Sequence, residues 1–93
     1  MTAAGGTVRV RLFAAARDAA GTAEVAADPQ PLGALLDGLR REHGRQFSNV
    51  LDTARVWVNG DDPHDGDATV LAAGDEVAVL PPVSGGAGPD RAG

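Results

Sequence analysis

The residues best suited to chemistry lie near the end of the chain, in the run Leu80-Pro81-Pro82-Val83-Ser84-Gly85-Gly86. Pro81 and Pro82 restrict φ and favour an extended backbone, so we expect residues 81–86 to extend away from a preceding strand. Gly85 and Gly86 have no Cβ, which allows a narrow channel of another protein to enclose the backbone and bring the Gly86 carbonyl group to a nucleotide or an acceptor. The alternative is a flexible tail without a role, because Ser-Gly-Gly is also typical of linkers.

The side chains offer little competing chemistry. The chain contains no cysteine, and all eight of its basic residues are arginine. It therefore lacks a thiol for nucleophilic, metal or disulfide chemistry, and a lysine for a Schiff base, an isopeptide bond or a phosphate-binding loop. Ser48 and Ser84 lack the sequence context that activates a serine, and His43 and His64 lack nearby partner ligands. We expect no catalytic residue among these side chains.

The segment 61–67 is acidic and invites comparison with a calcium-binding loop. Asp61, Asp65 and Gly66 match three positions of an EF-hand loop, but Pro63 and Ala72 stand where that loop needs oxygen ligands. We therefore interpret the segment as a solvated acidic loop and expect no metal site.

The length and charge of the chain limit its function further. Its 93 residues allow one domain, with a net charge of −5 and arginines spread along it, which does not indicate a nucleic-acid-binding surface. No apolar run approaches the roughly 20 residues that span a membrane, and no signal peptide is recognisable. We expect a cytoplasmic protein that contacts neither membrane nor nucleic acid and whose acidic surface favours a basic protein partner.

Composition also predicts the domain boundaries. Residues 1–6 and 87–93 are small, polar or glycine-rich and have no hydrophobic periodicity. We expect a disordered N-terminus at 1–6, a folded domain at 7–80, an extended Gly-Gly tail at 81–86 and a C-terminal extension at 87–93.

Hydrophobic periodicity predicts one main helix, which begins near Pro31 and ends before Gly44. Four leucines form its buried stripe: Leu32, Leu35, Leu36 and Leu39. Strands are predicted at residues 7–13, 22–27, 55–58 and 76–80, a short helical turn at 45–52, and either a short strand or a turn at 68–71. The segment 14–21 is taken as the connection of a hairpin between the first two strands.

Two positions in these elements matter for the rest of the chain. In the first strand Phe13 falls on the polar face, where it is either covered by a neighbouring loop or available to a partner. Asn59-Gly60 is a strong turn signal after the third strand.

The order of the elements predicts an α+β fold in which one main helix packs on one face of a mixed four- to five-stranded sheet. The last strand is expected to lie centrally beside the first, because both are apolar and alternating. Residues 81–86 would then leave the sheet at its edge.

These features resemble the MoaD/ThiS family of ubiquitin-like sulfur carriers, and most of all its branch of molybdopterin synthase small subunits. The resemblance covers about residues 8–86, and its most specific part is the Pro-Pro-Val-Ser-Gly-Gly run. It also rests on Val8-Arg9-Val10-Arg11-Leu12-Phe13-Ala14 with Arg17 and Gly21, the leucine helix, Val58-Asn59-Gly60 and Gly74-Asp75-Glu76-Val77.

The resemblance implies a β-grasp (ubiquitin-like) fold and a sulfur-carrier mechanism. A ubiquitin-activating-like adenylyltransferase would use MgATP to adenylate Gly86, and a sulfide or persulfide would displace AMP to give a thiocarboxylate. The large subunit of molybdopterin synthase would then accept the sulfur. The protein itself would bind no cofactor and would not be an enzyme.

The resemblance also implies roles for the residues around the tail. Phe13 and Leu80 correspond to a partner interface, and Gly86 to the site of adenylation. The residues that would thread into the partner are Pro81, Pro82, Val83, Ser84 and Gly85.

The chain departs from this branch in one respect, because residues 87–93 follow the Gly-Gly pair. The Gly86 carbonyl is therefore part of an amide, and a peptidase would have to remove the extension before adenylation. This departure keeps other functions open, namely sulfur transfer to cysteine, thiamine or sulfur-containing secondary metabolites, and a ubiquitin-like protein modifier. An interaction module with an inert tail is a further alternative.

Overall fold

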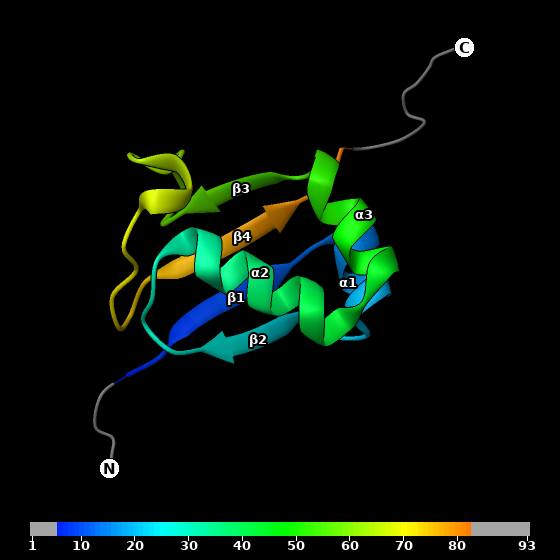
Figure 1. Ribbon diagram of the computed structural model, residues 1–93, viewed down its shortest axis with the longest axis horizontal. Helices are drawn as coiled ribbons and strands as arrows, with labels where there is room; N and C mark the ends of the chain where they lie inside the picture. Colours follow the sequence, from blue (N-terminus) through cyan, green and yellow to red (C-terminus); the bar gives the residue numbers. More distant parts are fainter. Residues whose placement is uncertain (1–5, 83–93) are drawn as a thin grey trace.

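The computed structural model describes residues 6–82 (Figure 1). Within this range the chain forms a four-stranded sheet, three α-helices and a short 3₁₀ helix. In chain order the elements are β1 (Val8–Leu12), α1 (Ala14–Ala20), β2 (Glu24–Ala27), α2 (Leu32–His43), α3 (Arg45–Thr53), β3 (Arg55–Val58), η1 (Gly66–Ala68) and β4 (Glu76–Leu80).

The sheet is mixed and has the strand order β2-β1-β4-β3. The two central strands, β1 and β4, pair in parallel, and each pairs antiparallel with its outer neighbour. Helix α2 lies across one face of this sheet (Figure 1). This is the β-grasp fold, so the predicted fold class and the predicted central place of the last strand are both confirmed.

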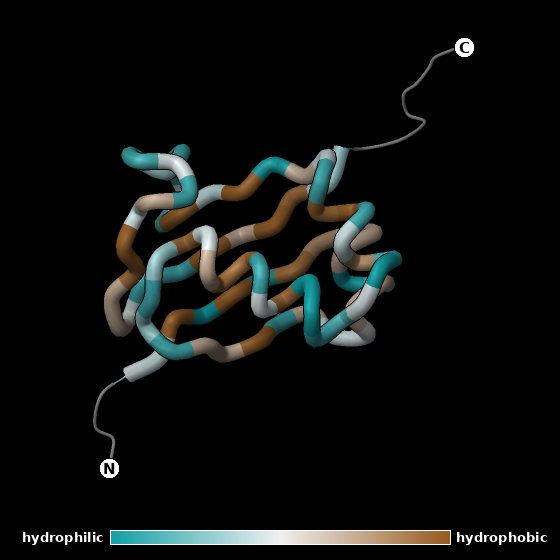
Figure 2. The backbone as a smooth tube through the Cα atoms, in the orientation of Figure 1, coloured by the Kyte–Doolittle hydropathy of each residue, from teal (hydrophilic) through white to brown (hydrophobic). Residues whose placement is uncertain are grey.

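The hydrophobic core lies between the sheet and the helices. Alternate residues of β1 and β4 point into it, and the hydropathy colouring shows apolar positions along both strands (Figure 2). Leu32, Leu35 and Leu39 of α2 are buried as predicted, whereas Leu36 lies at the margin and is only partly buried. Phe47 is fully enclosed, and burying a side chain of that size contributes about 1.5–3 kcal/mol.

Two helices differ from the sequence prediction. Strands β1 and β2 pair as the predicted hairpin would, but helix α1 forms their connection, with Ala16 buried in the core. Helix α3 is nine residues long, because both Phe47 and Leu51 reach the core. Residues 68–71 form no regular strand; Val70 makes a single bridge to Pro31 after η1 ends.

The predicted Asn59-Gly60 turn is confirmed. Asn59 has a φ of 53° and Gly60 a φ of 86°, and Val58 bridges to Asp61 across them. A left-handed pair of this kind matches the twist of a two-residue hairpin loop. The chain therefore reverses tightly at the end of β3.

Asn59 also holds the start of β4. Its side-chain amide donates to Asp75 Oδ1 at 3.1 Å, and its Oδ1 accepts from the Glu76 N–H at 2.9 Å. The Ala72 N–H donates to Asp75 Oδ2 at 2.8 Å. The pKa of Asp75 lies below its ordinary value of 3.8, because hydrogen bonds stabilise its charged carboxylate. The hydrogen bond from the Ala72 N–H has the larger effect, and the one from the Asn59 side chain has the smaller effect.

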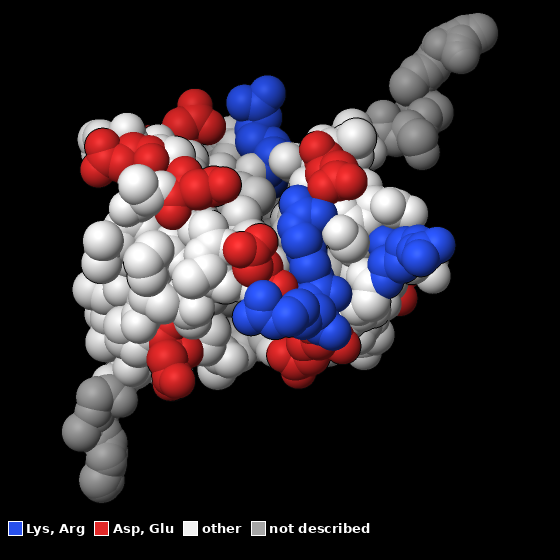
Figure 3. Space-filling view, in the orientation of Figure 1, with Lys and Arg blue, Asp and Glu red and all other residues white. Residues whose placement is uncertain are grey.

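The helix-covered surface carries both signs of charge, with arginines grouped over the helices and carboxylates around them (Figure 3). One cation, Arg40, ties α2 to α3: its Nη1 donates to Ser48 Oγ and to Asp52 Oδ1, both at 2.7 Å. Within residues 6–82, no helix has the length and apolar character needed to cross a bilayer.

Candidate functional site

The helices leave one face of the sheet uncovered. On each central strand the residues that alternate with the buried valines point to this open face, because successive side chains of a strand lie on opposite sides. From the four strands, the residues on the open face are Arg9, Arg11, Glu24, Ala26, Arg55, Trp57, Glu76, Ala78 and Leu80.

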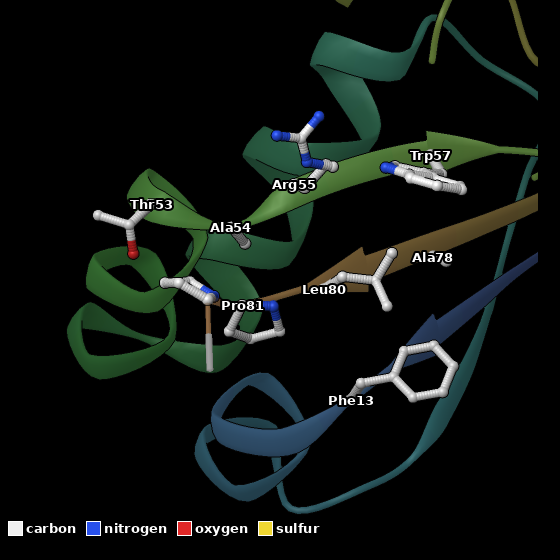
Figure 4. Close-up of a pocket in the computed structure, with 9 residues that line it drawn as sticks. Phe13, Thr53, Ala54, Arg55, Trp57, Ala78, Leu80 and Pro81 are labelled. Carbon is white, nitrogen blue, oxygen red and sulfur yellow. The ribbon is translucent and has the colours of Figure 1, made fainter. Parts of the chain in front are cut away.

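The open face contains a hollow of about 780 Å³ at the end of the sheet where β4 finishes (Figure 4). We call it the open-face hollow. Its floor and walls are mostly apolar, and Arg55 is the one charged residue among those that line it. The lining residues are Phe13, Thr53, Ala54, Arg55, Trp57, Ala78, Leu80, Pro81 and Pro82.

The strand register brings the lining residues together from distant parts of the chain. In the pairing of β3 with β4, Trp57 lies opposite Ala78 and Arg55 opposite Leu80. Phe13 directly follows β1, and its N–H donates to the Val79 carbonyl at 3.2 Å. The parallel pairing of β1 with β4 therefore places the Phe13 ring beside the Leu80 side chain (Figure 4).

Phe13 and Leu80, the two predicted partner-interface residues, both line the open-face hollow. Of the two possibilities left open for Phe13, the structure favours availability, because the residue is 38% exposed. The Arg11 guanidinium carbon lies 5.7 Å from the centre of the Phe13 ring, within cation–π range. Phe13 is thus oriented by a neighbour and still open to solvent.

Two ion pairs join neighbouring strands on the open face. Arg11 pairs with Glu76 at 3.4 Å, and Arg9 pairs with Glu24 at 3.1 Å. All four side chains are at least two-fifths exposed, so each pair contributes at most about 1 kcal/mol. None of the four residues lines the open-face hollow.

Sequence reasoning missed Trp57 and Arg55 as site residues. Alternation along the strand at residues 55–58 puts Trp57 on the face opposite Val56 and Val58, which is the same kind of signal that singled out Phe13. A large aromatic on the face of an outer strand that turns away from the core is a candidate contact residue.

The tail is described only at its beginning. Pro81 and Pro82 follow β4 and line the hollow, so the path toward the Gly-Gly pair starts beside Phe13 and Leu80. The predicted threading residues Val83, Ser84 and Gly85 and the predicted adenylation site Gly86 lie outside the described residues. Within residues 6–82, no three His, Asp or Glu side chains gather into a group that could hold a metal ion.

The pattern of the whole chain matches a known family. A model of the ThiS family matches residues 10–86, which runs from β1 through the Gly-Gly pair. The chain belongs to the ThiS family. Members of this family are small carrier proteins. A separate comparison of the chain with curated protein sequences finds no match.

Solved structures of similar proteins agree with this family assignment. SAMP1 from Haloferax volcanii is 33% identical, with a TM-score of 0.73 over 86% of this chain and 99% of that one. Molybdopterin converting factor subunit 1 from Pyrococcus furiosus is 26% identical, with a TM-score of 0.72 over 84% of this chain and 99% of that one. The complex of subunits 1 and 2 of the molybdopterin-converting factor from Helicobacter pylori contains a chain that is 25% identical, with a TM-score of 0.63 over 85% of this chain and 97% of that one.

The ThiS-family fold and the open-face hollow together define what the site offers. The described part presents a mostly apolar surface with one cationic residue, Arg55, and Pro81 and Pro82 lie at its margin. An apolar surface of this kind can bind another protein.

Proposed function

We propose that this protein is a sulfur carrier whose C-terminal glycine, Gly86 after processing, is converted to a thiocarboxylate. The observation that carries the proposal is the ThiS-family match, which extends through Gly86 and stops there. The favoured pathway is molybdopterin synthesis in the cytoplasm, supported by the likeness to molybdopterin converting factor subunit 1 from Pyrococcus furiosus.

The chemistry requires activation of a carboxylate, which is a poor electrophile. An adenylyltransferase partner uses MgATP to form the Gly86 acyl-adenylate and releases pyrophosphate. Sulfide then attacks the acyl carbon, the bond to the AMP oxygen breaks, and a thiocarboxylate remains. If the persulfide of a sulfur donor attacks instead, AMP leaves and an acyl disulfide forms between Gly86 and the donor. A second thiol then attacks the donor's sulfur atom. The thiocarboxylate stays on Gly86, and the donor and the second thiol leave joined as a disulfide.

This chain contributes a reactive end and a docking surface, and its partners contribute the catalysis. Phe13 and Leu80 in the open-face hollow provide apolar contact for the partner. Pro81 and Pro82 limit the conformations of the chain that leads to Gly86, which lowers the entropy lost when the tail enters a channel.

The sulfur-accepting partner is proposed to be a synthase large subunit. The Helicobacter pylori structure contains subunits 1 and 2 of the molybdopterin-converting factor in one complex, and its matching chain covers 85% of this one. The same open face would meet a large subunit here.

Residues 87–93 require one further step. Because the sequence continues to Gly93, the Gly86 carbonyl is an amide and offers no carboxylate for adenylation. A peptidase that hydrolyses the Gly86–Ala87 bond would create that carboxylate. The extension would therefore keep the carrier inactive until it is removed.

A second candidate function is a protein modifier, in which Gly86 is joined to lysine amines of other proteins. The likeness to SAMP1 from Haloferax volcanii, a small archaeal modifier protein, favours it. Transfer of sulfur to cysteine, thiamine or a secondary metabolite stays the alternative within the carrier class.

Intact-mass measurement of the protein from its native cells tests the proposal. We expect a species ending at Gly86, of which a fraction carries sulfur in place of one carboxylate oxygen. Gly86→Ala should remove the sulfur-bearing species, and the control Gly88→Ala, beyond the cleaved bond, should leave it unchanged.

Two outcomes would count against a sulfur carrier. If only the chain ending at Gly93 is found under growth that demands sulfur transfer, adenylation of Gly86 has no substrate. If adducts of higher mass are found instead and vanish in Gly86→Ala, the protein is a modifier.

A further inference from the structure

Arg55 gives the open-face hollow a charge opposite to that of the chain. The chain carries a net charge of −5, yet the one charged residue lining the hollow is a cation. Ion pairs within residues 6–82 involve Arg9, Arg11, Arg17 and Arg40, but not Arg55. The exposed Arg55 guanidinium therefore has no carboxylate partner in the described part of the chain.

Trp57, two residues further along β3, has an unused hydrogen-bond donor. Its indole Nε1 is withdrawn from solvent and has no acceptor among the described residues. A buried N–H without an acceptor costs on the order of what a hydrogen bond is worth, so such groups in native proteins are usually paired. An acceptor supplied by a binding partner would remove that cost.

The two donors lie on the same face of the same strand. Residues i and i+2 of a strand point to one side, and the Trp57 ring is drawn with its nitrogen toward the Arg55 end of β3 (Figure 4). An acceptor can reach Nε1 only if neighbouring side chains move, and Arg55, two residues away on the same face, is exposed and can change its rotamer. The apolar surroundings, including Leu80 and Ala78, strengthen a charged hydrogen bond by excluding water.

We propose that Arg55 and Trp57 form a carboxylate-binding pair in the open-face hollow, and that the hollow accepts a partner segment with an acidic residue next to an apolar one. The apolar side chain would pack against Phe13 and Leu80. One carboxylate oxygen would accept from Trp57 Nε1–H and the other from the Arg55 guanidinium. This inference rests on the proposed function, because it assumes that a partner protein occupies the hollow. It adds the chemistry that the partner's segment must have.

Charge complementarity favours this occupant over a basic one. A basic segment would place a cation beside Arg55 and leave the indole N–H without an acceptor. The acidic surface elsewhere still repels an acidic partner at long range, so a preference for acid at the hollow must come from local contacts.

The test uses the single tryptophan of the chain as the reporter. The indole N–H of Trp57 gives one signal in a ¹H–¹⁵N correlation spectrum of the full-length protein. The probes are two acetylated and amidated peptides, Leu-Glu-Leu-Asp-Leu and its uncharged counterpart Leu-Gln-Leu-Asn-Leu. We expect saturable displacement of the indole signal by both peptides, with the acidic peptide about tenfold tighter.

Two arginine variants separate the pair from general electrostatics. Arg55→Gln should reduce the preference for the acidic peptide to about twofold or less, because the charged donor is lost. Arg41→Gln removes an exposed arginine of α2 that is also in none of these ion pairs, and it should keep the preference. The experiment requires no adenylation, so it can fail while the intact-mass experiment succeeds, and the reverse.

Four outcomes would overturn the proposal. Equal affinity for both peptides would make the hollow a purely apolar site, and an acidic preference that persists in Arg55→Gln would place the carboxylate elsewhere. No saturable displacement by either peptide would exclude the hollow as a site for such segments. If instead the indole signal of the free protein shifts when the chain is ended at Gly86, the occupant is the protein's own extension and not a partner.

Discussion

Replacing Gly38 by alanine should stabilise the protein, whereas the same replacement at Gly33 should not. Both glycines lie inside α2, where glycine costs about 1 kcal/mol relative to alanine because it loses more backbone freedom on folding. A Cβ added at Gly38 meets no atom within 4 Å. Gly38→Ala should therefore recover the helix propensity in full, about 1 kcal/mol.

At Gly33 the structure leaves little room. A Cβ would lie 3.0 Å from Asp67 Cβ and 3.3 Å from the Asp67 carbonyl oxygen, both closer than ordinary contact. Asp67 belongs to η1, which is held against α2 by the Leu32 N–H donating to the Thr69 carbonyl at 2.8 Å. Moving η1 costs on the order of 1–3 kcal/mol, as overpacking does, and this cancels or exceeds the propensity gain.

Thermal and urea unfolding of the two variants checks this expectation, with circular dichroism and Trp57 fluorescence as independent probes of two-state behaviour. Gly38→Ala should raise Tm by roughly 4–8 °C, the shift expected for about 1 kcal/mol in a domain of this size. Gly33→Ala should leave Tm unchanged or lower it. An equal rise in both variants would refute the packing of η1 against α2, and no rise in Gly38→Ala would refute the assigned propensity cost.

Two further predictions concern polar contacts that hold elements together. Asp75 has a lowered pKa in the folded state, so its carboxylate stabilises the fold above the ordinary aspartate pKa of 3.8, and this contribution is lost as the pH falls through the lower folded value. Asp75→Asn should therefore lower the urea midpoint at pH 7. The difference in urea midpoint between the variant and the unmodified protein should disappear in strong acid. A difference that stays constant at every pH would contradict a lowered pKa for Asp75. Arg40→Lys should lower stability by about 0.5–1 kcal/mol, because the lysine nitrogen ends one bond short of Arg40 Nη1 and is more strongly hydrated, so the bonds to Ser48 and Asp52 weaken, while the exposed Arg41→Lys should change the urea midpoint little. Equal effects of the two lysine variants would show that the α2–α3 contact does not depend on the guanidinium.

Several elements could be predicted from sequence because their signals are local. The leucine spacing of α2 and the Asn59-Gly60 turn depend on residues a few positions apart, and both are present. Helix α1 could not be predicted, because its alanine-rich segment buries only Ala16 and has no apolar stripe to read. Its formation is decided by packing against α3 and β4.

The sequence by itself determined the order of the main elements, the alternation of their faces and the Gly-Gly run that the ThiS-family model includes. These follow from backbone geometry and periodicity, which act within a few residues. Only the tertiary structure decided that Phe13, Trp57 and Leu80 share one hollow with Arg55 at its side. That grouping depends on strand register across the sheet, and register is set by burying one face of every strand at once, which no local segment encodes.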